Sequence, residues 1–565
     1  MYEKGAGKYL APFLFLVIAF AFTGFLTASA RDDPFPRFEV KHREYPGEGC
    51  FVFAVSPWLI ILDSDGDPLF YRKIEGGVRN FRVQPGAVLT YYDVSASRFY
   101  AVDPYYHVVD SFFVAGDYTT DFHSLRVLPG GHVLIMGTQL RHVDMSSVVS
   151  GGDPNATARD VILQELDEDN HVIFQWNSRN HFAITDADTL LVDFTASVID
   201  YVHANSFIQT PDSNFLLTSR NMSEVTKINR YTGEIIWRLG GKHNQFTDNV
   251  YGVDIRAVHS AVLLSDTSML LFDNGTGERN FSQGLEYRVD QNKKKLKRIR
   301  NYSREPEIFT PVMGNIQAVN PTRRLIGWGK NDGNLICTVY DTVPEPVMEI
   351  KPADQDPYWS YSVSFGRWED SVLDVSIDTL TFGVLPAGDS LEKSFTVVNT
   401  GEDNMILTGF SSPNAAFTCK NGFPEGIKTG DSLIIRVRFR PDTAGEYFSV
   451  VMLNFTPDNV DPATERIIRK VKLHGISRLG STVLDRPEEL FISVTPNPFH
   501  ESFTLFYHEK ITRMDVASVT GRMVYRSEHP YSGMTVALGK ETAGIYFLYL
   551  FREGRIPVIR KIIKY

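Results

Sequence analysis

The chain contains 565 residues, enough for about three or four domains that each bury a core of their own. Hydrophobic residues make up 43% and charged residues 22%, values that exclude a wholly disordered, collagen-like or coiled-coil chain. The net charge of −11 leaves no broad basic surface for a nucleic-acid backbone, so no nucleic-acid partner is expected. The many Phe, Tyr, Gly and Pro residues favour short strands joined by tight turns, and we expect an all-β chain.

The N-terminus carries the features of a secretory signal peptide. Two lysines precede an apolar run from Leu10 to Leu26, and Ala28-Ser29-Ala30 forms a small-x-small cleavage pattern. Residues 1–30 are therefore predicted to be a signal peptide. A retained membrane anchor is the alternative, although the run lies near the lower end of spanning length. We expect no stable membrane span after processing.

Three cysteines are too few for a disulfide scaffold. Cys50, Cys337 and Cys419 also lack the CxxC spacing of a metal site. Packing must therefore stabilise the cores, and whether Cys50 and Cys337 form a disulfide stays open.

A hairpin pattern recurs between residues 37 and 370: an apolar strand, a four-residue turn and a second apolar strand. Internal repeats of this size predict a β-propeller. One unit lies around Cys50 to Lys73, and the turns of five more begin at Pro85, Pro129, Pro211, Ser265 and Pro321. The sequence therefore predicts six blades. The long spacing between the turns at Pro129 and Pro211 predicts an insertion within Asn177–Asp200 rather than a seventh blade.

Two smaller β-domains are predicted to follow. Residues 374–477 have about seven segments of alternating apolar and polar residues with turn signals between them, which favours an immunoglobulin-like sandwich. The amino-acid sequence of this domain resembles the Ig-like spacer modules of bacterial surface proteins. Residues 489–565 contain short alternating strands separated by Gly and Pro turns, which favours a small β-sandwich.

The propeller repeats place polar residues at matched positions. Alignment of the hairpins on their turns pairs residues that are 15 apart: His123 with Thr138, Asn205 with Arg220, His259 with Asn274, and Asn315 with Lys330. His203 lies two residues before Asn205, on the same side of its strand. Because the first strand of each blade lines the central channel, His123, His203, Arg220 and His259 are predicted to meet at one channel mouth.

Three imidazoles and a guanidinium without an evident carboxylate favour an anionic tetrahedral guest. Zinc is the first alternative, since three histidines can bind it, but no short-spaced ligand pair occurs and a guanidinium beside the metal is unfavourable. Arginine presents a rigid fork of donors that suits sulfate, phosphate or carboxylate oxygens. Neutral histidine acts as a nucleophile, acid or base near pH 7. We expect no metal and no cofactor.

Five segments carry a family resemblance: residues 200–206 (DYVHANS), 217–220 (LTSR), 233–241 (GEIIWRLGG), 271–275 (LFDNG) and 313–315 (MGN). In their order and in their residues these motifs resemble the arylsulfate sulfotransferases that do not depend on 3′-phosphoadenylyl sulfate, and the resemblance covers most of residues 120–350. The resemblance implies a six-bladed propeller that moves a sulfuryl group from an aryl sulfate donor to a phenolic acceptor through a sulfated histidine.

The same resemblance implies roles for the matched residues. His259 would be the nucleophile, His203 and Arg220 the sulfate-binding pair, and His123 the remaining active-site histidine. The division of roles between His123 and His203 stays open. Asn205, Asn274 and Lys330, predicted beside the same channel, are candidates for orienting the substrate.

Two alternatives remain for the function. A non-catalytic surface propeller could bind sulfated or anionic glycans through the same cationic mouth. A sulfatase-like hydrolase would use water as the acceptor, but the sequence lacks a Cys that begins a Cys-x-Pro-x-Arg motif. The physiological donor and acceptor, and the oligomeric state, stay open.

The C-terminal segments carry a second resemblance. Residues 494–499 (VTPNPF), 514–516 (MDV), 520–522 (TGR), 543–547 (AGIYF) and 560–565 (RKIIKY) resemble the type A C-terminal sorting domain of the type IX secretion system. This resemblance implies the type IX secretion machinery as a partner. It also implies export through an outer membrane, so the protein would be secreted or remain at the cell surface, with anchoring or release left open.

Overall fold

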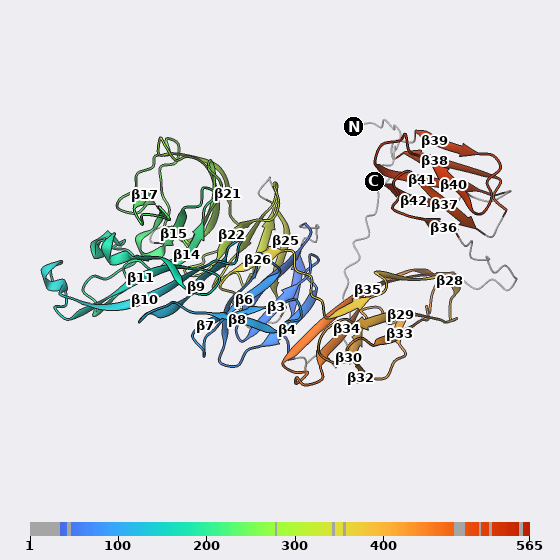
Figure 1. Ribbon diagram of the computed structural model, residues 1–565, viewed down its shortest axis with the longest axis horizontal. Helices are drawn as coiled ribbons and strands as arrows, with labels where there is room; N and C mark the ends of the chain where they lie inside the picture. Colours follow the sequence, from blue (N-terminus) through green and yellow to red (C-terminus); the bar gives the residue numbers. More distant parts are fainter. Residues whose placement is uncertain are drawn as a thin grey trace, which may run out of the picture. The chain divides into compact units, whose positions relative to one another are not determined.

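The computed structural model describes residues 34–41, 47–276, 279–341, 345–353, 358–478, 492–507, 510–518, 522–552 and 558–565. The predicted signal peptide lies outside these residues. The chain divides into two compact units, residues 1–479 and 480–565. The described residues form strands and four short 3₁₀ helices, as the all-β prediction requires (Figure 1). None of the described helices is long and apolar enough to cross a membrane.

Six antiparallel sheets form the propeller, and the six-bladed prediction is confirmed. From the innermost strand outward, the blades are β26 (Val363–Gly366), β2 (Cys50–Val55), β3 (Trp58–Leu62) and β4 (Pro68–Lys73); β5 (Val78–Gln84), β6 (Val88–Asp93), β7 (Arg98–Val102) and β8 (Val108–Phe112); β9 (Thr119–Val127), β10 (Val133–Val143), β11 (Ala156–Leu166) and β12 (Val172–Asn177); β14 (Ala204–Gln209), β15 (Phe215–Ser219), β16 (Glu224–Ile228) and β17 (Ile235–Gly240); β18 (Ser260–Ser265), β19 (Ser268–Asp273), β20 (Gln283–Asp290) and β21 (Lys295–Tyr302); and β22 (Asn315–Ala318), β23 (Arg324–Gly327), β24 (Cys337–Tyr340) and β25 (Pro346–Pro352). β1 (Phe38–Lys41) adds a fifth strand beside β25.

The first blade closes the ring with strands from both ends of the propeller. β26 pairs with β2 from Cys50↔Gly366 to Phe53↔Val363, so the last propeller strand becomes the innermost strand of the first blade. Cys50 and Cys337 are buried and free, and the disulfide left open above is therefore not formed. Burial raises the pKa of the Cys50 thiol to about 12, which keeps it protonated and unreactive.

Polar side chains tie the innermost strands of neighbouring blades together. Gln84 Nε2 donates to the Leu125 carbonyl at 3.3 Å, and Ser124 Oγ accepts from the Phe207 amide at 3.2 Å. Asn315 Nδ2 donates to the backbone carbonyl of β26 at 2.9 Å. Because these bonds satisfy polar groups beside the axis, they fix the strands around an open central channel.

The predicted insertion lies between the third and fourth blades, where the described residues form no further sheet. It contains η2 (Ser178–Asn180), η3 (Ile184–Asp186) and β13 (Val198–Ile199), which pairs in parallel with β11. The hairpin between β10 and β11 is also long and carries η1 (Met145–Ser147). Buried Phe182, Ala187 and Val192 of the insertion share a core with these two blades, so the segment that leads into His203 is held firmly.

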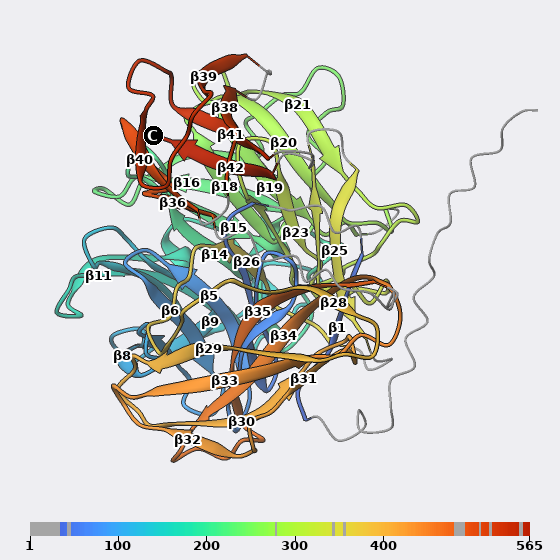
Figure 2. The same ribbon diagram turned by 90° about the vertical axis from the view of Figure 1, so that its right-hand side faces the viewer.

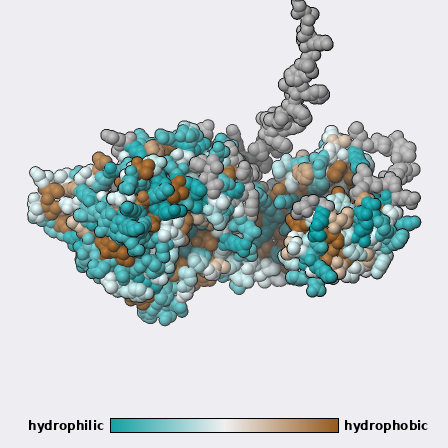
Figure 3. Space-filling view, turned by 90° about the horizontal axis from the view of Figure 1, so that it is seen from above, coloured by the Kyte–Doolittle hydropathy of each residue, from teal (hydrophilic) through white to brown (hydrophobic). Residues whose placement is uncertain are grey.

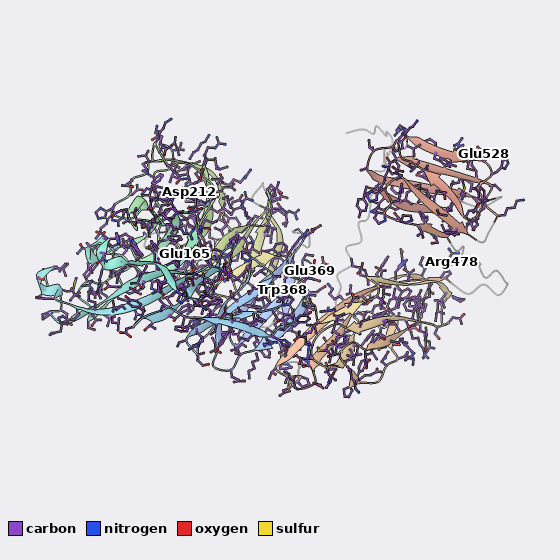
Figure 4. The ribbon with its side chains drawn as sticks, in the orientation of Figure 1. Glu165, Asp212, Trp368, Glu369, Arg478 and Glu528 are labelled. Atoms are coloured by element: carbon purple, nitrogen blue, oxygen red, sulfur yellow. The ribbon has the colours of Figure 1, made fainter. Side chains whose placement is uncertain are left out.

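The immunoglobulin-like domain continues the sheet of the first blade, whose β3 and β4 lie beside β34 (Gly445–Pro457) and β35 (Glu465–Arg478) in Figure 1; Figure 2 shows the domain from the side. One sheet orders β27 (Leu373–Val375), β29 (Leu391–Asn399), β33 (Ser432–Phe439) and β31 (Phe417–Cys419); the other orders β28 (Thr379–Pro386), β35, β34, β30 (Met405–Ser411) and β32 (Glu425–Ile427). β35 pairs with β4, and Arg72 Nε contacts Glu465 Oε2 at 2.7 Å across this junction. Trp368, labelled in Figure 4, is buried in a core that both domains share.

The second unit is a small two-sheet sandwich. Its sheets are β36 (Ile492–Thr495), β37 (Ser502–Tyr507) and β40 (Met534–Ala537), and β39 (Met523–Ser527), β38 (Arg513–Ser518), β41 (Gly544–Phe551) and β42 (Val558–Lys564). Leu505, Val516 and Leu548 are fully buried between the sheets. On the face of the protein drawn in Figure 3, hydrophilic and hydrophobic side chains are mixed.

Candidate active site

Four predicted residues line one cavity of about 180 Å³ at an end of the central channel. His123, His203, Arg220 and His259 lie in its wall, together with Phe122, Val312, Met313 and Tyr361. The histidines precede or belong to the innermost strands of three successive blades. The structure therefore brings together the side chains that the repeat pattern predicts at one channel mouth.

His123 stacks on Phe122, whereas its contacts with His203 and Tyr361 and the contact of Tyr361 with His259 are edge to face. The ring centroids of His123 and His203 are 5.1 Å apart, and Tyr361 lies 5.5 Å from His123 and 5.1 Å from His259. Tyr361 thus lies between two of the histidines, and its hydroxyl donates to the Asn205 carbonyl at 3.0 Å. Burial raises the pKa of the Tyr361 hydroxyl well above its usual value, so the group stays neutral.

The predicted strand register is wrong, although the predicted convergence is present. Thr138 pairs with Thr119 rather than His123, and Asn315 pairs with Gly327 rather than Lys330. The pairing of β9 with β10 shifts at a bulge between Ile135 and Gly137, beyond a turn in which Gly131 has a left-handed φ of 88°. The turn between β22 and β23 is centred on Pro321, earlier than the alignment predicts.

Bulges also shift the register in the other two hairpins. The register of β14 and β15 shifts at Asn205, so that the Arg220 amide bonds to the His203 carbonyl at 3.0 Å instead of facing Asn205. The His259 amide donates to the Phe272 carbonyl, also at 3.0 Å, so His259 does not face Asn274. A bulge turns neighbouring side chains toward the axis without changing the order of the blades.

His259 is the most deeply buried of the three histidines, with 4% of its surface exposed. Burial lowers its pKa well below the usual value, and the nearby charges of His123, His203 and Arg220 act in the same direction, while a hydrogen bond with the Gly314 backbone opposes them. His259 is therefore neutral near pH 7 and keeps a lone pair on its ring. A neutral imidazole surrounded by cationic groups is suited to nucleophilic attack.

Two carboxylates that the sequence interpretation missed stand behind the other histidines. Asp121 Oδ1 lies 2.5 Å from His123 Nδ1, and Asp200 Oδ2 lies 2.7 Å from His203 Nδ1. Each carboxylate engages Nδ1 and leaves Nε2 for the cavity. Burial alone would raise the pKa of Asp121, but the adjacent His123 and His203 lower it, so the carboxylate is ionised. The spacings Asp-x-His and Asp-x-x-His are the signals that could have identified these residues.

Arg220 offers hydrogen-bond donors to the cavity. Nη1 donates to Asn221 Oδ1 at 2.8 Å and Nη2 to the Pro311 carbonyl at 3.0 Å, while Nε is buried and has no partner among the described residues. Burial lowers the pKa of Arg220, and the charge of Asp200 only partly opposes this. A buried guanidinium with an unused donor favours an anion in the cavity.

The three predicted substrate-orienting residues occupy different places. Asn205 is buried in the central channel, and neither of its amide atoms has a hydrogen-bond partner among the described residues. Asn274 Nδ2 instead donates to the carbonyls of Thr310, at 2.7 Å, and Met313, at 2.9 Å. Lys330 is exposed, and its Nζ lies 4.5 Å from the Trp359 ring centre. Asn274 therefore holds a loop beneath the cavity, and neither it nor Lys330 lines the cavity wall, contrary to the prediction.

A second cavity of about 280 Å³ adjoins the first, sharing Met313 and Tyr361. Its further lining includes Tyr358, Trp359 and Arg79, whose guanidinium lies 4.8 Å from the Phe122 ring centre. An aromatic lining next to a polar cavity suits a ligand with one planar apolar end and one anionic end. Neither Arg79 nor Tyr361 was identified from the sequence, although Arg79 stands six residues before the turn at Pro85, as His123 does before the turn at Pro129. Tyr361 lies in none of the five hairpins that the turns align.

The described residues contain no cluster of three or more His, Cys, Asp or Glu side chains with the arrangement of a metal site. The donor chemistry agrees with this, since the Nδ1 atoms of two histidines are engaged by carboxylates and the third histidine lies beside a guanidinium.

Comparisons with known proteins identify two regions. The arylsulfotransferase (ASST) family model matches residues 51–355, and the HYDIN/CFA65/VesB-like Ig-like domain model matches residues 371–467. No curated protein matches the chain.

Similar solved structures are distant. They include a protein of unknown function from Bacteroides caccae (8% identity, 57% of this chain and 100% of that chain, TM-score 0.38). Catalytically inactive virginiamycin B lyase from Staphylococcus aureus with quinupristin matches at 8% identity, over 59% of this chain and 97% of that chain, with a TM-score of 0.32. The ASH/PapD-like domain of human CEP192 matches at 16% identity, over 20% and 88%, with a TM-score of 0.18. Likenesses at this level carry no argument about function.

Proposed function

Because the chain belongs to the arylsulfotransferase (ASST) family, we propose that it moves a sulfuryl group from an aryl sulfate donor to a phenolic acceptor without 3′-phosphoadenylyl sulfate. The observation that carries the proposal is the single cavity in which a neutral histidine, two carboxylate-paired histidines and a guanidinium meet. Sulfuryl transfer resembles phosphoryl transfer, in which charge spreads over peripheral oxygens and positioned cationic donors supply most of the catalysis.

Donor binding uses both cavities. The sulfate oxygens accept hydrogen bonds from the free Nε of Arg220 and from Nε2 of His203. The aryl ring lies against Met313 and Tyr361 and extends toward Trp359. These contacts hold the sulfur atom in line with the ring of His259.

The first chemical step sulfates His259. A ring nitrogen of the neutral imidazole attacks sulfur, and the bond between sulfur and the aryl oxygen breaks. The electron pair of that bond passes to the aryl oxygen, and His123 gives it a proton through Nε2, so that a phenol leaves. The Asp121 carboxylate stabilises the His123 imidazolium before this transfer.

The second step returns the enzyme to its initial state. An acceptor phenol gives its proton to His123, and its oxygen attacks the sulfur of sulfated His259. The nitrogen–sulfur bond breaks, and the pair returns to the imidazole. The cycle is ping-pong and needs no cofactor or metal, since both protons pass through His123.

A transfer assay tests the proposal. The purified protein is incubated with an aryl sulfate, with and without added phenol, beside His259→Asn, and rapid quenching with sulfur-labelled donor detects sulfated protein before acceptor is added. We expect the wild type to release donor phenol in proportion to the added acceptor and to carry the sulfur label before acceptor is added. His259→Asn should lose this release. A non-catalytic glycan-binding propeller would bind the donor without releasing phenol, and a hydrolase would release it regardless of acceptor.

We also propose that the protein is exported. The lysines, apolar run and small-residue motif of residues 1–30 support a signal peptide, and the motifs of residues 489–565 support a type IX sorting domain. In a host with this secretion system, deletion of residues 492–565 is expected to leave the protein in the periplasm, whereas the full chain reaches the surface or medium. Equal surface exposure of the two forms would contradict the sorting role.

A further inference from the structure

The central channel is a polar cavity of its own, distinct from the site of sulfuryl transfer. Its volume is about 640 Å³, and innermost strands from all six blades line it. His123, His259 and Tyr361 lie in the walls of both cavities, so they separate the two spaces. Apart from histidines, the only charged residues in its described lining are Arg82 and Arg126, and no carboxylate is among them.

Arg126 lacks the partner that a guanidinium in such a position requires. Among the described residues its side chain makes no hydrogen bond and no ion pair, and burial lowers its pKa to about 10. Two other enclosed arginines of the propeller are paired: Arg238 Nε contacts Glu224 at 2.8 Å, and Arg324 Nη2 contacts Glu286 at 3.1 Å. Arg126 is half-buried in the channel wall and has no counter-charge among the described residues, so an anion beside it would be favoured.

The channel supplies further donors for such an anion. Arg82 donates from Nη2 to Ser362 Oγ at 3.0 Å and from Nε to Asn80 Oδ1 at 3.1 Å, so neutral groups orient it and leave its charge uncompensated. The buried Asn205 amide lines the same channel and has no hydrogen-bond partner in the part of the chain that the structure describes. Two guanidinium groups and one amide form a donor set that suits oxyanions.

We propose that the central channel binds a small oxyanion of the sulfate type, held by Arg126 with Arg82 and Asn205 as additional donors. This site lies behind His123 and His259, on the side away from the aryl pocket. It stands on residues that the sulfuryl-transfer mechanism does not use, apart from the shared wall. Carboxylates share the chemistry that the donors recognise, so the test includes one.

Thermal unfolding in the presence of anions tests the site. Wild type, Arg220→Met, Arg126→Met and the double variant are titrated with sodium sulfate, sodium benzoate and sodium chloride at matched ionic strength. The Arg220→Met variant weakens the transfer cavity, so the sulfate response that it retains reports the channel. We expect the double variant to bind sulfate about tenfold or more weakly than Arg220→Met alone. Arg288→Met, which removes an exposed arginine of β20, is the matched control and should retain the wild-type response.

Several outcomes separate this proposal from its failure. A sulfate response that disappears in Arg220→Met alone, or that is equal in Arg220→Met and the double variant, would show that the channel holds no anion, and the proposal would be wrong. A benzoate response that depends on Arg126 and exceeds that of sulfate would overturn the sulfate assignment. If Arg126→Met folds poorly, Arg126→Gln, measured by calorimetric titration with sulfate, replaces it. Because no arm measures sulfuryl transfer, the result does not depend on the proposed function.

Discussion

The Asp121→Asn substitution tests which of the two carboxylate-paired histidines, His123 or His203, donates the proton to the leaving group. Its carboxylate lies 2.5 Å from His123 Nδ1 and also accepts the His123 amide at 2.7 Å, so it fixes both the ring and the backbone of this residue. In Asp121→Asn the amide replaces the carboxylate, removes the negative charge that stabilises the imidazolium, and no longer fixes the ring tautomer. His123 then loses its capacity to donate a proton to the leaving phenolate.

The size of the effect should depend on the donor. Positioned acids contribute about 10²–10⁴-fold to catalysis, and the contribution is largest when the leaving group is a strong base. We therefore expect kcat/KM of Asp121→Asn to fall by about 10²-fold or more for phenyl sulfate, and by less than about tenfold for 4-nitrophenyl sulfate, whose leaving phenolate needs little proton donation. A plot of log kcat/KM against leaving-group pKa becomes steeper.

Asp200→Asn is the matched control. Asp200 contacts His203 Nδ1 at 2.7 Å, and His203 is proposed to hold sulfate oxygens, which all donors share. Its kcat/KM should fall by a similar factor for every donor, leaving the slope unchanged. Equal slopes in wild type and Asp121→Asn, or a steeper slope in Asp200→Asn alone, would refute the assignment of His123 as the acid and favour His203 instead.

Three further predictions follow from burial and charge. In the unfolded chain His259 is protonated below about pH 6.5, whereas the buried ring of the folded protein stays neutral, so the free energy of unfolding falls as the pH drops from about 6.5 toward the folded-state pKa. We therefore expect denaturant unfolding to show that His259→Asn removes about 1.4 kcal/mol of the stability lost between pH 7.5 and 5.5. An unchanged pH dependence in this variant would contradict the neutral ring. Glu465→Gln breaks the enclosed ion pair with Arg72 and should lower the free energy of unfolding by about 3 kcal/mol. Glu392→Gln, at an exposed ion pair, should lower it by less than about 1 kcal/mol. Equal losses in the two variants would argue against a firm junction between propeller and sandwich. Trp359→Ala should raise KM for aryl sulfates about tenfold with a smaller change in kcat, and an unchanged KM in steady-state assays would place the aryl ring elsewhere.

The sequence predicts the blades better than the contacts between them. Turn motifs such as the one at Pro129 recur within one chain segment, so six hairpins and the insertion before His203 can be counted directly. The register cannot, because a left-handed residue such as Ser213, with φ of 66°, or a bulge at Asn205 adds a position without a distinct sequence signal. Tyr361 is hidden for another reason: it precedes the strand that closes the ring, far along the chain from His123 and His259, and only ring closure brings it between them.

The carboxylates, more than the histidines themselves, distinguish the roles of the three rings. His123 and His203 each have an aspartate at Nδ1, which fixes their tautomers and stabilises a positive charge on them. His259 has no such contact among the described residues and is more deeply buried, so a proton on it is disfavoured. A ring that must carry a lone pair toward sulfur needs the second environment, and rings that must carry a proton or hold an anion need the first.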